Sequence, residues 1–266
     1  ISIGESTLTD TEMITLAKSY LKNTKLSVHV IPGIATINRD INPAIENGVD
    51  IFRIASHCTE ASMTKSHIEY IKSKNKTVYG ALMMCATCSL DTLVEEVKKL
   101  KSYGADAVII MDSTGSFLPD QVKECFVKLS EVGIKLGFHA HNNLSLAVAN
   151  SLIAIQHGAS IIDATVNGFG AGAGNTPLEI MTIINSPSNM NVMDHIEKLE
   201  YKSPTIKLIN ILTAKNKLHS VFEKEILYSA KKYNIKIPNL VKELGNRKLV
   251  AGQEDLVRVI ASQMAE

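Results

Sequence analysis

The chain has 266 residues, of which 45% are hydrophobic, and its formal net charge is +1. A chain of this length can bury a sizeable core, either in one large domain or in one large and one small domain. The near-neutral charge, without long runs of like charge or basic stretches interleaved with aromatic residues, argues against a nucleic-acid-binding protein.

Neither a membrane span nor a secretion signal is visible. No apolar stretch reaches the length of about 18 residues that a spanning helix needs, and no charged, apolar and small segments open the chain as in a signal peptide. The first residues, Ile1-Ser2-Ile3-Gly4, are typical of the interior of a longer sequence. Four cysteines in apolar surroundings suit a reducing compartment. We therefore expect a cytoplasmic globular protein.

Strand-like and helix-like segments alternate along most of the chain. Apolar, β-branched runs recur at intervals of roughly 25 to 29 residues, the length of one strand, one helix and two short loops. The predicted strands are Leu26–Ile31, Asp50–Ala55, Thr77–Met84, Ala107–Met111, Ile134–His139 and Ser160–Val166. The predicted helices are Thr9–Asn23, Ile37–Asn47, Thr64–Lys74, Leu90–Tyr103, Pro119–Val132 and Leu144–His157. Gly48, Gly104, Gly133 and Gly158 precede strands, as helix C-caps should.

This alternation predicts a parallel sheet covered by helices on both faces. A doubly wound sheet would carry a glycine-rich phosphate loop after its first strand, and none is present. The alternative is a TIM (β/α)₈ barrel, an α/β fold, of which about six βα units are in this chain. Because six such strands are too few to close a barrel, we expect two βα units ahead of Ile1.

The pattern changes at about residue 186. Helical periodicity then dominates at Val192–Leu199, Thr205–Thr213, Val221–Tyr233, Ile237–Leu244 and Asp255–Met264. We therefore predict two domains, a partial barrel at 1–185 and a small α-helical domain at 186–266.

The clearest candidate site is the stretch Gly137-Phe138-His139-Ala140-His141-Asn142-Asn143. His139 and His141 are two residues apart at the end of a predicted strand, so their side chains lie on one face. Barrel active sites form at the C-terminal ends of the strands. We therefore expect the two imidazoles to bind one divalent metal ion, the alternative being two structural polar residues.

Two further loops follow strands. Asp112-Ser113-Thr114-Gly115 carries short polar side chains that can orient a substrate or simply cap a turn, and the turn is the simpler interpretation. The glycine-rich segment 167–175 can bring backbone N–H groups to an anion or act as a hinge. His57-Cys58-Thr59-Glu60 ends another strand. Cys85-Ala86-Thr87-Cys88 is a C-x-x-C motif whose context favours packing over redox or zinc chemistry.

Several motifs together resemble the 4-hydroxy-2-oxovalerate aldolases, which belong to the pyruvate-type metalloaldolase barrels with hydroxymethylglutaryl-CoA lyase and isopropylmalate synthase. The resemblance runs from about Leu21 to Glu179 and resumes in Phe222–Val259. It is carried by Ile31-Pro32-Gly33-Ile34, His57-Cys58-Thr59-Glu60-Ala61, the histidine stretch 137–146, the segment Gly170–Glu179 and Gly252-Gln253-Glu254-Asp255.

The resemblance implies that His139 and His141 ligate Mn²⁺ or Mg²⁺, and that His139 and Ser113 contact the substrate. The ion would chelate a 2-oxo acid, and cleavage of the C3–C4 bond would leave a pyruvate enolate and a short aldehyde. The family further implies an acylating acetaldehyde dehydrogenase partner. The C-terminal helices offer apolar faces, for instance at Val221, Ile226, Leu227 and Ala230, for that partner, for homo- or hetero-oligomers, or for packing on the barrel.

Two family features are absent from this sequence. The first strand of the family carries a Leu-Arg-Asp-Gly motif with a third metal ligand, an arginine and, a few residues on, a histidine base, so no acid–base residue can be named here. The family also has an active-site tyrosine just before the helix that starts at Phe222. The corresponding stretch of this chain, Thr213-Ala214-Lys215-Asn216-Lys217-Leu218-His219, is shorter than usual and has no tyrosine. We therefore expect the chain as given to be catalytically incomplete. An acyl-CoA lyase or synthase and a non-catalytic barrel scaffold are the alternatives to an aldolase.

Overall fold

The computed structural model describes residues 6–185, 191–199, 201–247, 249–250 and 252–265. The described residues form two compact units that interleave along the chain. Unit 1 takes its residues from 1–83, 91–109 and 132–135, and unit 2 from 84–90, 110–131 and 136–266. The predicted domain boundary after residue 185 falls on residues 186–190, which lie outside the described residues.

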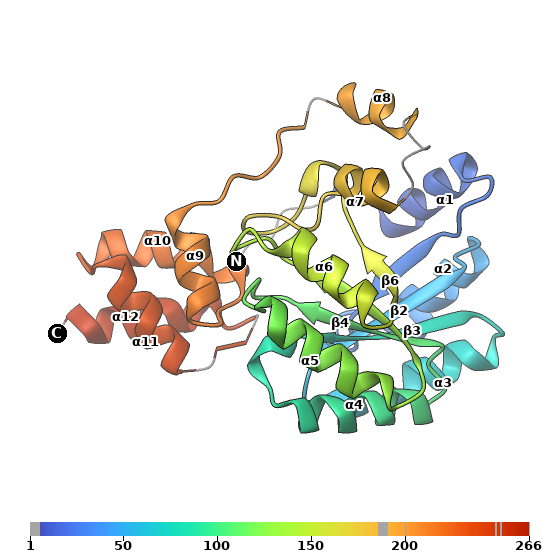
Figure 1. The fold of residues 1–266 in the computed structure, drawn as a ribbon, viewed down its shortest axis with the longest axis horizontal. Helices are drawn as coiled ribbons and strands as arrows, with labels where there is room; N and C mark the ends of the chain where they lie inside the picture. Colours follow the sequence, from blue (N-terminus) through green and yellow to red (C-terminus); the bar gives the residue numbers. More distant parts are fainter. Residues whose placement is uncertain (1–5, 186–190, 200, 248, 251, 266) are drawn as a thin grey trace. The chain divides into compact units, whose positions relative to one another are not determined.

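Six strands lie in a single sheet in chain order, as the repeat predicts (Figure 1). They are β1 (Ser27–Val30), β2 (Ile51–His57), β3 (Thr77–Met83), β4 (Ala107–Asp112), β5 (Lys135–Ala140) and β6 (Ala159–Asp163). β1 pairs in parallel with β2, β2 with β3, and β5 with β6. The predicted alternation of strand and helix is confirmed, and the ends of the strands differ from the predicted ones by at most three residues.

Helices alternate with the strands, and α1 precedes the first strand. In the first part of the chain they are α1 (Asp10–Tyr20), α2 (Asn42–Glu46), α3 (Lys65–Ser73), α4 (Leu90–Ser102), α5 (Pro119–Ser130), α6 (Ala147–Gln156) and α7 (Leu178–Asn185). A π-helical turn, η1 (Ile37–Ile41), precedes α2. Thr9 caps α1: its hydroxyl accepts the N–H of Glu12, and the Glu12 carboxylate accepts the N–H of Thr9.

An aspartate just before a strand joins it to its neighbour at two places in unit 1. The Asp50 carboxylate accepts the N–H of Leu26 at 2.9 Å and pairs with Lys18 at 2.8 Å. The Asp106 carboxylate accepts the N–H of Val78 at 2.8 Å and pairs with Lys72 at 2.7 Å. Each carboxylate thus satisfies a backbone N–H at or just before the start of the preceding strand.

The strands are buried because helices cover them closely. Phe52, Ile54, Val78 and Ile109 have no exposed surface. In β3, Gly80 lets α4 approach: a Cβ there would lie 2.7 Å from the Leu100 side chain. Within the part of the chain that the structure describes, no helix combines the length and apolar character needed to cross a membrane.

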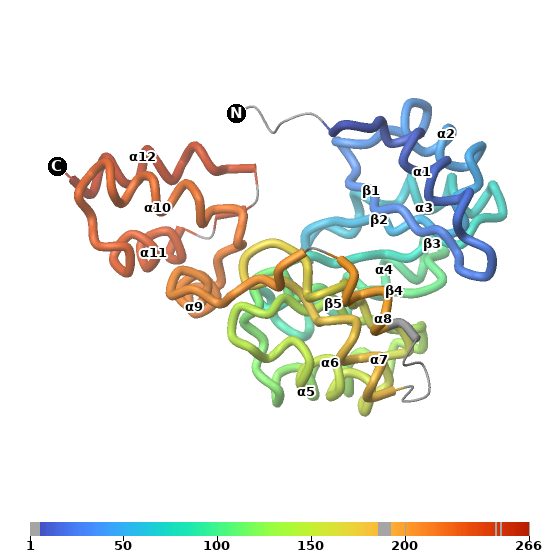
Figure 2. The backbone as a smooth tube through the Cα atoms, turned by 90° about the horizontal axis from the view of Figure 1, so that it is seen from above, coloured from blue at the N-terminus to red at the C-terminus, as the bar shows by residue number. Residues whose placement is uncertain are grey.

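The last part of the chain is helical, as predicted. It contains α8 (Asn191–Glu197), α9 (Leu208–Lys215), η5 (Ser220–Phe222), α10 (Glu223–Lys232), α11 (Ile237–Asn246) and α12 (Glu254–Ala265). Figure 2 shows α10, α11 and α12 side by side. Ile226 and Ala230, expected on an available apolar face, are instead buried in the core that these helices form, whereas Val221 and Leu227 are about two-fifths exposed (40% and 44%).

Candidate functional site

The two histidines of the predicted site lie at the C-terminal end of β5. His139 is the penultimate residue of β5, and His141 follows the strand and forms an isolated bridge with Asn175. The two ring centroids are 5.2 Å apart. Rings that bind one ion through bonds of about 2 Å have centroids roughly 4–6 Å apart. The two-residue spacing therefore predicted the observed proximity correctly.

A carboxylate from the neighbouring strand orients His139. Asp163 is the last residue of β6 and lies opposite His139 in the β5–β6 register. Its Oδ2 is 2.9 Å from Nδ1 of His139. Because a carboxylate can only accept, we assign the proton to Nδ1, and Nε2 then carries the lone pair that a metal would take. Asp163 was not among the residues predicted for the site, although it lies inside the predicted strand Ser160–Val166.

His141 is held in the neutral form. Burial, followed by the nearby rings of His139 and His219, lowers the pKa of His141 to about 3. Its Nδ1 is buried and has no hydrogen-bond partner within the described residues. A neutral imidazole with an unsatisfied nitrogen is the form that ligates a metal without competition from protons near neutral pH.

Asn175 contributes a second unsatisfied acceptor next to His141. It is 9% exposed, and its Nδ2 donates to the carbonyl of Phe169 at 3.0 Å. Its Oδ1 has no partner among the described residues. These orphaned acceptors fit a cation. No group of three or more His, Cys, Asp or Glu side chains suited to a metal occurs in the described residues. The two imidazoles therefore fit part of a coordination shell, which hard divalent ions complete with oxygen ligands.

The segment after β4 is a turn built on Asp112. This buried carboxylate accepts the N–H groups of Ser116 and Phe117, both at 3.0 Å. Burial raises the pKa of Asp112 to about 6, although the backbone hydrogen bonds oppose the shift. Ser113, predicted to bind substrate, is 2% exposed, and its Oγ accepts the N–H of Met84 at 2.9 Å. Asp112 has the turn-capping role, and the substrate role of Ser113 stays a prediction.

The glycine-rich loop after β6 packs against the histidine motif. Several of its amides already donate within the protein: Ala173 to Asn143 Oδ1 at 3.3 Å, Gly174 to Ala171 at 3.0 Å and Asn175 to Gly168 at 3.0 Å. In return, the carbonyl of Gly174 accepts the N–H of Asn142 at 2.8 Å. These contacts favour a loop that holds the site together over one that offers its amides to an anion.

A segment far along the chain joins this site. Asn143 Nδ2 donates to Ser220 Oγ at 3.0 Å, a buried hydrogen bond across 77 residues. The neighbouring His219 brings its ring centroid to 6.4 Å from that of His141. Burial lowers the pKa of His219. The sequence offered no spacing from which to select His219, because its proximity arises only from the fold.

The other motifs belong to different surroundings. His57 ends β2 in unit 1, where its Nδ1 lies 2.8 Å from Thr59 Oγ1. Cys85 is buried, and the Cys88 thiol donates weakly to its carbonyl at 3.7 Å. All four cysteines are free thiols. The packing interpretation of the C-x-x-C motif is therefore the better supported one.

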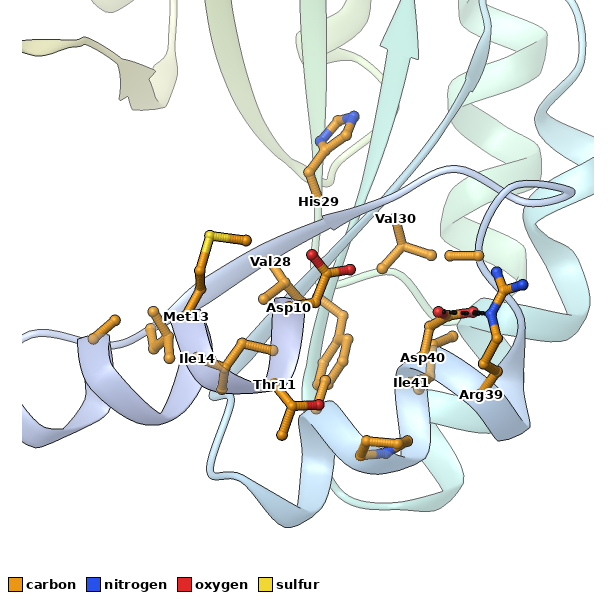
Figure 3. A pocket seen from close by; sticks show the side chains of 16 residues that line it. Asp10, Thr11, Met13, Ile14, Val28, His29, Val30, Arg39, Asp40 and Ile41 are labelled. Atoms are coloured by element: carbon orange, nitrogen blue, oxygen red, sulfur yellow. Dashed lines mark hydrogen bonds and ion pairs between the residues drawn. The ribbon is translucent and has the colours of Figure 1, made fainter. Parts of the chain in front are cut away.

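A separate pocket of about 370 Å³ lies in unit 1 (Figure 3). Met13 and Ile14 of α1 line one side, and Val28 and Val30 of β1 another. Neither His139, His141 nor Ser113 contributes to this lining. The pocket is thus distinct from the histidine site.

Comparison with known families divides the chain in two. Residues 1–200 match the HMGL-like family, and residues 217–266 match the DmpG-like communication domain. Among curated proteins, the 4-hydroxy-2-oxovalerate aldolase of Pectobacterium atrosepticum is 41% identical over 99% of this chain and 80% of its own length. The enzyme of the same name from Spirochaeta aurantia is 42% identical over 99% of this chain and 81% of its own.

Solved structures support the fold. The carboxyl transferase domain of Rhizobium etli pyruvate carboxylase, solved with pyruvate and biocytin, gives a TM-score of 0.77 at 14% identity, covering 96% of this chain and 50% of that one. The N-terminal domain of a Bacteroides vulgatus protein assigned as an aldolase gives 0.69 at 24% identity, covering 82% and 77%. At these identities the likeness shows a TIM-barrel-type fold and nothing further.

Proposed function

Because this chain belongs to the HMGL-like family, and within it to the 4-hydroxy-2-oxovalerate aldolases, we propose that His139 and His141 hold the divalent metal ion of a carbon–carbon lyase. Its proposed substrate is a 4-hydroxy-2-oxo acid, which is cleaved to pyruvate and a short aldehyde. Manganese is the proposed metal and magnesium the alternative. His139 and Ser113 are the proposed substrate contacts.

The observation that carries the proposal is a pair of neighbouring imidazoles whose protonation and orientation suit them to bind a cation. The Asp163 carboxylate fixes the proton on Nδ1 of His139, and burial keeps His141 neutral. The orphaned Nδ1 of His141 is costly in a buried site unless a ligand satisfies it. Histidines that bind metal ions in proteins commonly donate their other ring N–H to a carboxylate, as His139 does to Asp163.

Each residue of the site has a defined task in this chemistry. When bound, the ion supplies Lewis-acid polarisation of the keto acid. Asp163 keeps the His139 ring in one tautomer and one orientation. Asn143 and the loop at 170–175 hold the segment around His141 through the hydrogen bonds of Ala173 and Asn142. Ser113 lies in the turn after β4, where the resemblance places the substrate pocket.

The test is pyruvate release from 4-hydroxy-2-oxopentanoate by the full-length protein after metal removal and addition of Mn²⁺. We expect wild-type activity and its loss in His139→Ala. In Asp163→Asn, calorimetry should show Mn²⁺ affinity reduced about 10- to 100-fold, because the ring loses its orienting acceptor. Ser160→Ala, also on β6, is the matched control and should bind Mn²⁺ normally. Equal pyruvate release by wild type and His139→Ala would refute the proposal.

The relatives favour this function over the two alternatives. Both named relatives are aldolases rather than acyl-CoA enzymes, and they match 99% of the chain. The same assay separates an aldolase from a non-catalytic scaffold, since a scaffold would release no pyruvate.

Residues 217–266 match a communication domain, and this match supports a second part of the proposal. We propose that 1–185 is the catalytic domain and 186–266 a domain that binds an acylating acetaldehyde dehydrogenase. Exposed apolar side chains on α10, including Leu227 and Tyr228, are the proposed contacts. Oligomer formation and a cytoplasmic location remain predictions from the sequence.

A further inference from the structure

Residues 201–207 lead into α9 without forming helix or strand (Figure 1). This connecting segment contacts the glycine-rich loop after β6, residues 167–175. The Tyr201 ring packs edge-on against the Phe169 ring, with centroids 4.8 Å apart and ring planes at 67°. The carbonyl of Tyr201 also accepts a hydrogen bond from Asn167 Nδ2 at 3.3 Å. One residue of the connecting segment therefore contacts the loop through both its ring and its backbone.

Phe169 is the only large side chain of the glycine-rich loop, which otherwise has four glycines, two alanines and two asparagines. The Phe169 side chain is 60% exposed, so burial in the barrel does not hold it. Because glycine loses more conformational freedom on ordering than other residues do, such a loop depends on contacts from outside. Pro204 provides a second one, since its Cγ lies 2.8 Å from the position of a Cβ on Gly174.

The backbone of Phe169 joins the two ends of the loop. Its carbonyl oxygen accepts Thr165 Oγ1–H at 2.7 Å and Asn175 Nδ2–H at 3.0 Å. The second of these hydrogen bonds fixes which way the Asn175 amide is turned. A Cβ on Gly170 would lie 2.8 Å from Cγ of Asn175, so the loop also covers this amide closely. A displacement of Phe169 would therefore disturb Asn175.

The end of the loop is in turn hydrogen-bonded to the histidine motif. Asn175 forms the isolated bridge with His141. The carbonyl of Gly174 accepts the N–H of Asn142 at 2.8 Å, and the N–H of Ala173 donates to the side chain of Asn143 at 3.3 Å. Contacts thus run without interruption from Tyr201 through Phe169 and the loop to the residues around His141.

We propose that Tyr201 is a positioning residue for the histidine site. Its ring holds Phe169, and with it the glycine-rich loop, in the arrangement that orders His141 for a divalent ion. This inference rests on the metal site proposed above. Among the ring contacts of the described residues, Tyr201 pairs with Phe169 and with neither imidazole, so it acts through the loop. Without the ring pair, affinity for the ion falls in proportion to the fraction of molecules whose loop stays in place.

Mn²⁺ titration calorimetry on the full-length, metal-stripped protein tests the role of the ring. We expect Tyr201→Ala to raise the Kd about 3- to 10-fold, since an edge-to-face pair shifts an equilibrium by roughly this factor. Tyr201→Phe keeps the ring and should bind as wild type does. Tyr20→Ala on α1 is the matched control, because Tyr20 is 78% exposed and outside the ring pairs of the described residues. An unchanged Kd in folded Tyr201→Ala would overturn the inference.

A double-mutant cycle tests whether Tyr201 acts through Phe169. Phe169→Ala should weaken Mn²⁺ binding about as much as Tyr201→Ala does, because each variant removes the same ring pair. The double variant should then bind no more weakly than either single variant. Losses of affinity that multiply in the double variant would show that the two rings act independently, and would overturn the inference.

Amide hydrogen exchange of the metal-free protein gives a readout that needs no ion. In Tyr201→Ala the amides of residues 173–175 should exchange at least about threefold faster than in wild type, because the loop leaves its place more often. The amides of α6 should keep their wild-type rates, which shows that the fold is intact. Unchanged exchange at 173–175 would overturn the inference. If wild type binds no Mn²⁺ while the exchange rates differ as expected, the proposed metal site fails and the contact between Tyr201 and the loop stands.

Discussion

Asp112 shows how one buried side chain makes stability depend on pH. The carboxyl group has no exposed surface and holds the turn between β4 and α5 through two backbone hydrogen bonds. Its pKa is raised from 3.8 to about 6, chiefly by burial. The folded protein therefore binds the Asp112 proton more tightly than the unfolded chain does. The resulting contribution to the free energy of unfolding is fully present below the pKa of the unfolded state and is lost as the pH rises through the pKa of the folded state.

We expect Asp112→Asn to remove this dependence. Between pH 4 and pH 7 the group should lower the wild-type free energy of unfolding by roughly 2 kcal/mol. Urea denaturation of both proteins across this range measures the effect, because other titrating groups are common to both. Parallel curves of unfolding free energy against pH would show that Asp112 has an ordinary pKa.

Local spacing predicts some residues of the site and not others. The proximity of His139 and His141 follows from a two-residue interval on one strand, so the sequence alone contains it. Asp163 depends on the register between β5 and β6, which shifts at Leu136 and Gly137 and has no local signature. His219 depends on how the C-terminal helices fold back onto the motif. Residue-level prediction therefore ends where contacts between distant segments begin.

The loop after β6 is the element whose backbone most restricts substitution. Gly174 has a φ of +86°, and a Cβ there would collide with the carbonyl oxygen of Gly168. Gly158, at the join between α6 and β6, has a similar φ of +101° but no atom within 4 Å of the Cβ position. The two glycines differ in the space around them and hardly in backbone conformation.

This difference gives a matched pair of variants. Gly158→Ala should cost about 1–2 kcal/mol of unfolding free energy, the cost of a left-handed conformation. Gly174→Ala should cost roughly 1–3 kcal/mol more, because the loop must move to accept the methyl group. It should also weaken Mn²⁺ binding, since Gly174 accepts the N–H of Asn142 beside His141. Equal losses of stability in the two variants would contradict the close approach of the Gly168 carbonyl oxygen to Gly174.

Elements were predictable where polar and apolar faces alternate. The six strands and the helices between them follow from that periodicity, and the shifts at their ends are small. α7 is different, because Ile180, Ile183 and Ile184 are each at least two-fifths exposed (41–46%), so that its apolar residues do not mark a buried face. The π-helical turn before α2 likewise has no sequence signature that separates it from an α-helix.

At the scale of the whole molecule, the C-terminal helices have their own core. Leu218, Phe222, Ile226, Leu240, Val241, Leu244 and Val257 are buried together. Leu227 and Tyr228 of α10 remain 44% and 52% exposed. The sequence indicated a helical appendage here, but helical periodicity alone cannot say which apolar side chains face the core and which face a partner.

We expect Leu227→Asp to weaken binding of the proposed partner, an acylating acetaldehyde dehydrogenase, at least tenfold without changing pyruvate release, because a charge on an apolar interface is costly. Titration calorimetry with the purified dehydrogenase measures the effect. Leu16→Asp on α1, where Leu16 is 50% exposed, is the control for surface charge and should bind normally. Unaltered binding by Leu227→Asp would place the partner on another surface.

The hydrogen bond between Asn143 and Ser220 links the histidine motif directly to the segment that leads into the C-terminal helices. The turn that begins at His219 opens α10, so a movement of that helix carries the imidazole with it. Suppose that α10 has two positions and that the histidine site binds its ligand with different affinity in each. A molecule that binds one position of α10 more tightly then changes the affinity of the histidine site for that ligand. Thermodynamic reciprocity then requires the ligand of the histidine site to change the affinity of that molecule for α10 by the same factor.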